Sequence, residues 1–284
     1  AISASGCSRD ETQPTPVTSG TESPVLPLPA EEILPPAQPD ALVYPSTQSW
    51  QAAGPRQKAR AERSFTQLKR HEVPVYDGPL FVNDDEAVQL QTPQEVARRA
   101  IILWAVALRA EATPREEIIE LIDKANAWDS VSPTEREFLE ASDLDPALSQ
   151  ALVWRLESLW VMLWALGHLD ELDWPGDMCN VPRLVEIMRA QESSPTFITD
   201  AKLRSVEEIL DAQDLTMRIH WAIRDASLRV QTSVPQGLDW SGVVTWVPVA
   251  QCAGIGVVEE RHHALNWLVQ FLDPEDWDRV DTPT

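Results

Sequence analysis

The stretch DLTMRIHWAIRDA, residues 214–226, gathers arginine, histidine and aspartate side chains on one predicted helix. Such groups, held close together, could bind an anion or transfer a proton. On a helical wheel of about 100° per residue, Arg218 falls beside the apolar stripe and His220 lies on nearly the opposite side. This helix alone therefore cannot build one compact site. We favour an ordinary helix ion pair between Asp214 and Arg218, four residues apart.

A second charged helix is predicted near the C-terminus, in VVEERHHALNWLVQFL, residues 257–272. Glu260 and Arg261 fall on the two edges of its apolar stripe. Charges at the edge of a core-facing stripe need partners, because an unpaired buried charge is costly. We expect ion pairs between the two helices, Arg218 with Glu260 and Arg261 with Asp225.

If the same two helices bordered an open cleft, their polar side chains would form an enzyme site or a small-ligand site instead. The candidate residues for that alternative are Arg218, His220, Asp225, Glu260, Arg261 and His262. The sequence contains no G-x-S-x-G, P-loop or G-x-G-x-x-G motif, and we expect no cofactor.

A metal site is a weaker alternative at EERHH, which places Glu259 near His262 and His263. Adjacent histidines on a helix point about 100° apart and cannot chelate one ion side by side. A third ligand would also have to come from elsewhere in the chain, so we expect no metal.

Most of the chain from Thr92 onward has helical spacing of apolar residues, which predicts an all-α fold. Several of these helices open with Thr-Pro or Ser-Pro followed by glutamate, a typical helix start. The predicted helices are 92–112, 113–127, 132–141, 148–169, 181–190, 205–230 and 257–272. Before them, VPVYDGPLFVNDD at 73–85 has the pattern of a short hairpin.

The segment 148–169 is apolar almost all round and has the length of a membrane span. Arg155 and Glu157 interrupt it, and each would be costly in lipid. We therefore predict a buried central helix.

Residues 1–56 contain ten of the 23 prolines together with many polar residues. This composition buries too little apolar surface to offset chain entropy, so we expect an extended tether. Its first residues, AISASGC, resemble the end of a signal peptide followed by a lipobox. Lipid on Cys7 would make the protein an extracytoplasmic, membrane-anchored lipoprotein, whereas an ordinary thiol in a disordered arm is the alternative.

A basic island follows the tether, RQKARAERSFTQLKR at 56–70, with six Lys or Arg residues and one Glu. It begins the predicted 57–90 region, a basic helix and a short extended segment, which precedes a globular domain at 91–284. A solvated helix that neutralises the acidic domain is the interpretation we favour. Contact with lipid headgroups is the alternative, since a single lipid chain needs a second signal.

The net charge of −22 argues against nucleic-acid binding, which needs an excess of Lys and Arg. It indicates mainly solubility, and secondarily a preference for basic partners. The three cysteines show no metal-type spacing, and a Cys179–Cys252 disulfide and free buried thiols both remain open.

Several tryptophan-containing blocks occur in a characteristic order, among them WRLESLWVMLWALGHLDELDWPGDMCNV, EILDAQDLTMRIHWAIRDA, ERHHALNWL and WDRVDTPT. Over residues 90–284 they resemble a bacterial family, domain of unknown function 4272. The resemblance implies a compact helical domain without an assigned activity, and it transfers no catalytic role.

Three functions follow as hypotheses. The first is a non-catalytic binding or adaptor domain, exported and held off the membrane by residues 1–56, through which a protein partner would bind. The second is an enzyme or small-ligand receptor with its site between the 206–229 and 257–271 helices. The third is a permanent subunit of a larger complex. Charged pairs closed inside the core would favour the first, and an exposed cleft would favour the second.

Overall fold

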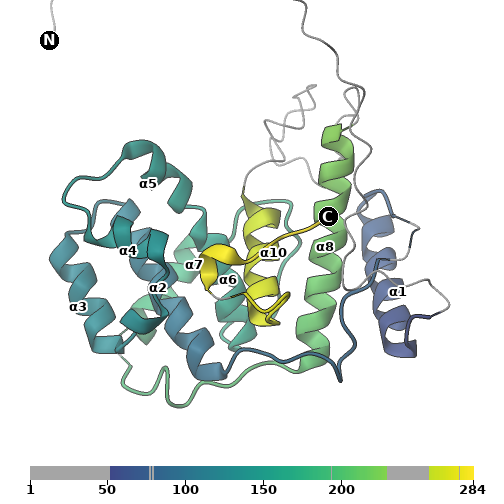
Figure 1. Cartoon of the computed structure of the whole chain (residues 1–284), viewed down its shortest axis with the longest axis horizontal. Helices are drawn as coiled ribbons and strands as arrows, with labels where there is room; N and C mark the ends of the chain where they lie inside the picture. The colour runs from purple at the N-terminus through teal and green to yellow at the C-terminus, as the bar shows by residue number, and fades with distance from the viewer. Residues whose placement is uncertain (1–51, 77, 79, 193, 229–255, 275) are drawn as a thin grey trace, which may run out of the picture. The chain divides into compact units, whose positions relative to one another are not determined.

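A computed structural model describes residues 52–76, 78, 80–192, 194–228, 256–274 and 276–284, all within the unit Val43–Thr284. These residues form helices and connecting segments, with no strand among them, which confirms the all-α prediction (Figure 1). The helices are α1 (Pro55–Arg70), α2 (Pro93–Ala110), α3 (Arg115–Ala125), α4 (Pro133–Glu140), α5 (Pro146–Leu152), α6 (Arg155–Ala165), α7 (Val181–Gln191), α8 (Val206–Leu228) and α10 (Val257–Leu268). Two short 3-10 helices are η1 (Trp128–Ser130) and η3 (Trp277–Arg279). Residues 1–51 of the predicted 1–56 tether lie outside the described residues, and its last two residues, Pro55 and Arg56, begin α1.

Helices α2 and α4 start where their Thr-Pro and Ser-Pro signals predict. The Thr92 hydroxyl accepts a hydrogen bond from the Glu95 backbone N–H, and the Glu95 carboxylate accepts one from the Thr92 N–H. Ser132 and Glu135 form the same reciprocal capping box at α4. Each box satisfies backbone donors that the first helical turn leaves without partners.

The core is built on α6, which packs against α2 and α10, while α8 lies between α10 and α1 (Figure 1). Every residue of α6 from Leu156 to Ala165 is buried. The predicted buried central helix is therefore confirmed in α6. Among the described residues, no helix combines the length and the apolar content that a membrane crossing needs.

The prediction of one continuous helix over 148–169 is wrong, because the chain breaks between α5 and α6. At the break, the Leu156 and Glu157 amides donate to the carbonyls of Val153 and Trp154, only three residues back. The tightened turn separates a mostly exposed α5 from a buried α6. Helix α6 can then enter the core along its whole length, and the Trp154 ring comes to lie against Gly256 at the start of α10.

The predicted hairpin at 73–85 is also wrong, since the described residues of that segment form no strand. Its apolar residues Leu80, Phe81 and Val82 are buried individually against helices. Side chains take the place of a partner strand: Gln57 donates to the Val82 carbonyl at 2.7 Å, and Arg218 donates to the Leu80 carbonyl. The backbone acceptors are satisfied without a ladder, so nothing requires a second strand.

Candidate functional site

The stretch 214–226 contributes Asp214 and Arg218 to a buried structural cluster. Arg218 donates from Nε to Asp214 Oδ2 at 2.8 Å, and each side chain is only 1% exposed. The Ser64 hydroxyl of α1 donates to the same carboxylate at 2.6 Å. The Asp214–Arg218 pair is thus confirmed. The predicted Arg218–Glu260 pair is wrong, because α1 and the extended segment after it enclose Arg218 together with Asp214.

The charges of α10 pair with α6. Arg261 Nε donates to Glu157 Oε2 at 3.0 Å, and both side chains are 1% exposed. Glu260 lies 3.1 Å from Arg155 Nη1 and also accepts from the Ser158 hydroxyl. The predicted partner of Arg261 was Asp225, a half-buried residue of α8, and that prediction is wrong. In both cases the α10 residue pairs with α6 instead, because α6 packs directly on α10 and supplies the opposite charge.

Two of the six candidates do come together. Nδ1 of His220 on α8 lies 2.9 Å from Nδ1 of His262 on α10, and the rings meet edge to face. Burial lowers the pKa of His220 to about 4, helped by the charge of Arg224, and it lowers the pKa of His262 well below its ordinary value. Both rings are neutral at pH 7, so one Nδ1 donates and the other accepts.

The helical wheel placed His220 away from the core, and this was wrong. His220 is 7% exposed and His262 only 2%, because α8 is covered by α1 on one side and by α10 on another. His263 instead packs against the Trp277 ring. Nowhere in the described parts of the chain do three His, Cys, Asp or Glu side chains group as a metal site would need.

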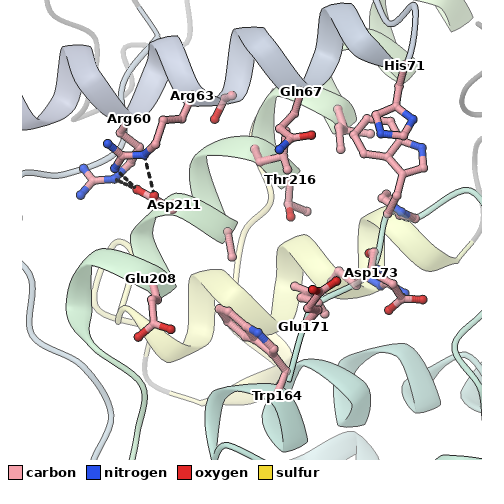
Figure 2. A pocket seen from close by; sticks show the side chains of 18 of the residues that line it. Arg60, Arg63, Gln67, His71, Trp164, Glu171, Asp173, Glu208, Asp211 and Thr216 are labelled. Carbon is pink, nitrogen blue, oxygen red and sulfur yellow. Dashed lines mark hydrogen bonds and ion pairs between the residues drawn. The ribbon is translucent and has the colours of Figure 1, made fainter. Parts of the chain in front are cut away.

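One feature that a ligand could enter was not predicted from the sequence. A groove of about 610 Å³ lies between α1, α8 and the segment 171–175 (Figure 2). We call it the α1–α8 groove. Its lining residues are Arg60, Arg63, Ser64, Gln67, Arg70, His71, Trp164, Glu171, Leu172, Asp173, Trp174, Pro175, Glu208, Asp211, Ala212, Leu215, Thr216, Ile219 and Arg261.

The α1 wall of the groove is held to α8 by ion pairs. Arg60 and Arg63 both bind Asp211, at 3.0 and 2.6 Å, as Figure 2 shows. This hydrogen-bonded pairing with Asp211 raises the pKa of Arg63. At the other end of α1, His71 stacks on Trp174 with ring centroids 3.8 Å apart. The basic island therefore pairs with carboxylates of the acidic domain, but the favoured interpretation of a solvated helix was wrong, because one face of α1, including Arg60, is buried against α8.

The lining of the groove includes a buried donor that is not fully used. Arg261 is 1% exposed, and its Nη2 makes no hydrogen bond within the described structure. The nearest carboxylate oxygen to this Nη2, on Asp173, is 3.7 Å away. Of the six candidates from the sequence, Arg261 alone lines the α1–α8 groove. Glu260 lines a separate hollow of about 480 Å³ beside Trp154 and Gly256.

The described residues form an all-helical domain. Arg218 and Arg261 are paired with carboxylates in its interior, and a polar groove remains accessible. The chain belongs to the family described as Domain of unknown function (DUF4272), whose model matches residues 60–280. The match starts within α1, so most of the groove's α1 wall belongs to the family domain. Comparison with curated proteins and with solved structures finds no match.

Proposed function

We propose that this chain is a non-catalytic adaptor domain that takes a segment of a partner protein in the α1–α8 groove. One observation carries the proposal. Arg218 and Arg261 form ion pairs with carboxylates, and the side chains of both arginines are only 1% exposed. A paired, buried charge is poorly placed to exchange protons with a substrate. The groove, in contrast, offers exposed side chains from three separate segments.

Photo-crosslinking from the groove tests this proposal in the organism that makes the protein. A photoreactive residue replaces Gln67, which is exposed and lines the groove. The matched control replaces Thr66, the exposed neighbour on the same helix that is not among the lining residues. We expect one identified protein, crosslinked at one segment, from position 67 and none from position 66. Equal capture at both positions, or none from position 67, would contradict an adaptor groove.

The second candidate function is a small-ligand receptor or enzyme with its site between α8 and α10. The observation that favours it is the contact of His220 with His262, which brings two candidate residues within 2.9 Å of each other. A small molecule that remains bound to the purified chain in native mass spectrometry would support this function. Loss of that molecule in a His262→Asn variant would locate it between the two helices.

We propose further that the protein is exported, that Cys7 carries a lipid, and that residues 1–56 hold the domain away from the membrane and contribute to partner binding. Intact mass spectrometry of the protein extracted from its native membrane tests this. A chain that begins at Cys7 with a diacylglycerol-sized mass supports the lipoprotein, and an unmodified chain contradicts it. A second protein in fixed stoichiometry would instead indicate a permanent subunit of a complex.

A further inference from the structure

One wall of the α1–α8 groove is formed by residues 171–175. It presents two carboxylates, and neither makes a close ion pair with a described residue. Glu171 is exposed and makes no hydrogen bond or ion pair with the described residues. Asp173 has a side chain that is 52% exposed, and it accepts one hydrogen bond, from Trp160 Nε1 at 2.7 Å. Its contact with Arg261 Nη2 is long, at 3.7 Å. Both carboxylates point toward the groove in Figure 2.

On the opposite wall, two of the three arginines of α1 are already engaged with other carboxylates. Arg60 pairs with Asp85 and Asp211, and Arg63 pairs with Asp211 and Glu207. Arg70, at the end of α1, is the exception, since it is exposed and has no ion pair within the described structure. Cationic groups of a ligand are therefore attracted to the 171–173 side.

The groove also has apolar lining residues. These are Trp164, Leu172, Trp174, Leu215 and Ile219. An apolar lining that includes carboxylates suits the long methylene stem and charged head of Lys or Arg. Aromatic rings in the lining add attraction for a cation.

Arg261, another lining residue, adds a hydrogen-bond donor that has no partner within the described structure. Arg261 Nη2 is buried, lines the groove and lacks a hydrogen bond in the described part of the chain. A buried donor without an acceptor is costly, and a main-chain carbonyl entering the groove would satisfy it. The hydroxyl of Thr216, 6% exposed, lies on the same lining.

We infer that the partner segment is basic: it places a Lys or Arg side chain against Glu171 and Asp173 and a main-chain carbonyl at Arg261 Nη2. This inference rests on the proposed adaptor function and specifies its ligand. The net charge of −22 acts in the same direction, because it steers basic partners toward the surface.

Three short capped peptides test the inference on the full chain. They share flanking leucines and differ only at the centre, which is Lys, norleucine or Glu. Binding is followed by the indole N–H signals of Trp164 and Trp174 in NMR spectra, assigned with Trp→Phe variants. We expect the Lys peptide to shift both signals and to bind about tenfold more tightly than the norleucine peptide, the ratio that one charge-assisted contact supplies.

A double variant, Glu171→Gln with Asp173→Asn, should remove this tenfold preference. Glu137→Gln is the matched control, because Glu137 is exposed on α4, distant from the lining residues. Equal or tighter binding of the norleucine or Glu peptide overturns the basic specificity but leaves the groove as a binding site. If no peptide shifts either signal while crosslinking from position 67 captures a partner, the inference fails and the adaptor function stands. If both experiments are negative, both fail.

Discussion

His220 and His262 share one hydrogen bond in the interior, Nδ1 to Nδ1 over 2.9 Å, and neither ring carries a charge there at neutral pH. The two residues come from α8 and α10, 42 positions apart in the sequence. A proton added at the accepting Nδ1 would turn this acceptor into a second donor, so the contact would become repulsive. The α8–α10 interface is thus sensitive to acid.

We predict that the protein loses stability as the pH falls through the acidic range. The pKa of His220 is lowered from 6.5 to about 4 in the folded protein. Below about pH 6.5 His220 binds a proton in the unfolded chain but not in the folded chain. The free energy of unfolding therefore falls until about pH 4. The His220 share of this loss is about 3 kcal/mol. Denaturant unfolding at a series of pH values measures it.

A His220→Asn variant isolates this share. Asparagine retains a polar group near the Nδ1 position but does not titrate, so the slope with pH should decrease by about 1.4 kcal/mol per pH unit. Ile219→Val is the control, because it removes a buried methylene from the same helix and costs about 1 kcal/mol at every pH. An unchanged slope in His220→Asn would refute the assignment. His263, whose pKa is lowered to about 3 by burial, accounts for part of the remaining slope.

The buried pair of Arg261 and Glu157 should be essential for folding stability. Glu157→Gln leaves the guanidinium buried without its charge partner, which costs about 3–5 kcal/mol. It also weakens the acceptor of the Cys179 backbone N–H, 2.6 Å away. The matched control is Glu186→Gln, whose pair with Arg183 is exposed and contributes under about 1 kcal/mol. Chemical denaturation of both variants at pH 7 gives the comparison, and similar losses would show that the buried pair has no special role.

Most helices were predictable because their information is local. Apolar spacing and the Thr92 and Ser132 starts determine where α2 and α4 begin, without reference to the rest of the chain. The break after Leu152 was not predictable, since apolar residues continue across it. It depends on how α6 fits between α2 and α10, which is tertiary information.

The partners of the charged residues and the groove required the same tertiary information. A helical wheel gives the direction of a side chain but not the helix that covers it, so Arg261 was assigned to Asp225 although α6 supplies Glu157. The ion pair of Arg63 with Asp211 joins residues 148 positions apart. The signal that could have indicated the groove was the basic island beside an acidic domain, because such islands need carboxylate partners.

Cys179 should be chemically inert in the folded protein. It is a buried free thiol whose pKa is strongly raised, mainly by burial and then by the charge of Glu157. Alkylation requires the thiolate, so a Cys7→Ser and Cys252→Ser double variant should react with iodoacetamide only after denaturation. The Glu157→Gln variant in the same background should react sooner, as local opening exposes the thiol. Rapid labelling of the native double variant would contradict this prediction.

The start of α10 should tolerate no side chain at Gly256. This residue has φ of +110°, and a Cβ built there would lie 2.5 Å from the Trp154 ring. Gly167 is a matched comparison, because its φ is also positive, at +80°, but nothing lies within 4 Å of its Cβ position. Gly167→Ala should cost about 1–2 kcal/mol from backbone strain alone. Gly256→Ala should cost about 1–3 kcal/mol more than Gly167→Ala, because the added methyl group overpacks against the ring.

A double-mutant cycle separates the two contributions at Gly256. In a Trp154→Ala background the overpacking disappears while the backbone strain remains, so the cost of Gly256→Ala should fall but not vanish. Thermal or urea unfolding of the four chains gives the coupling free energy. An identical cost in both backgrounds would mean that the ring yields freely, and the contact that joins the α5–α6 break to α10 would then contribute nothing to stability.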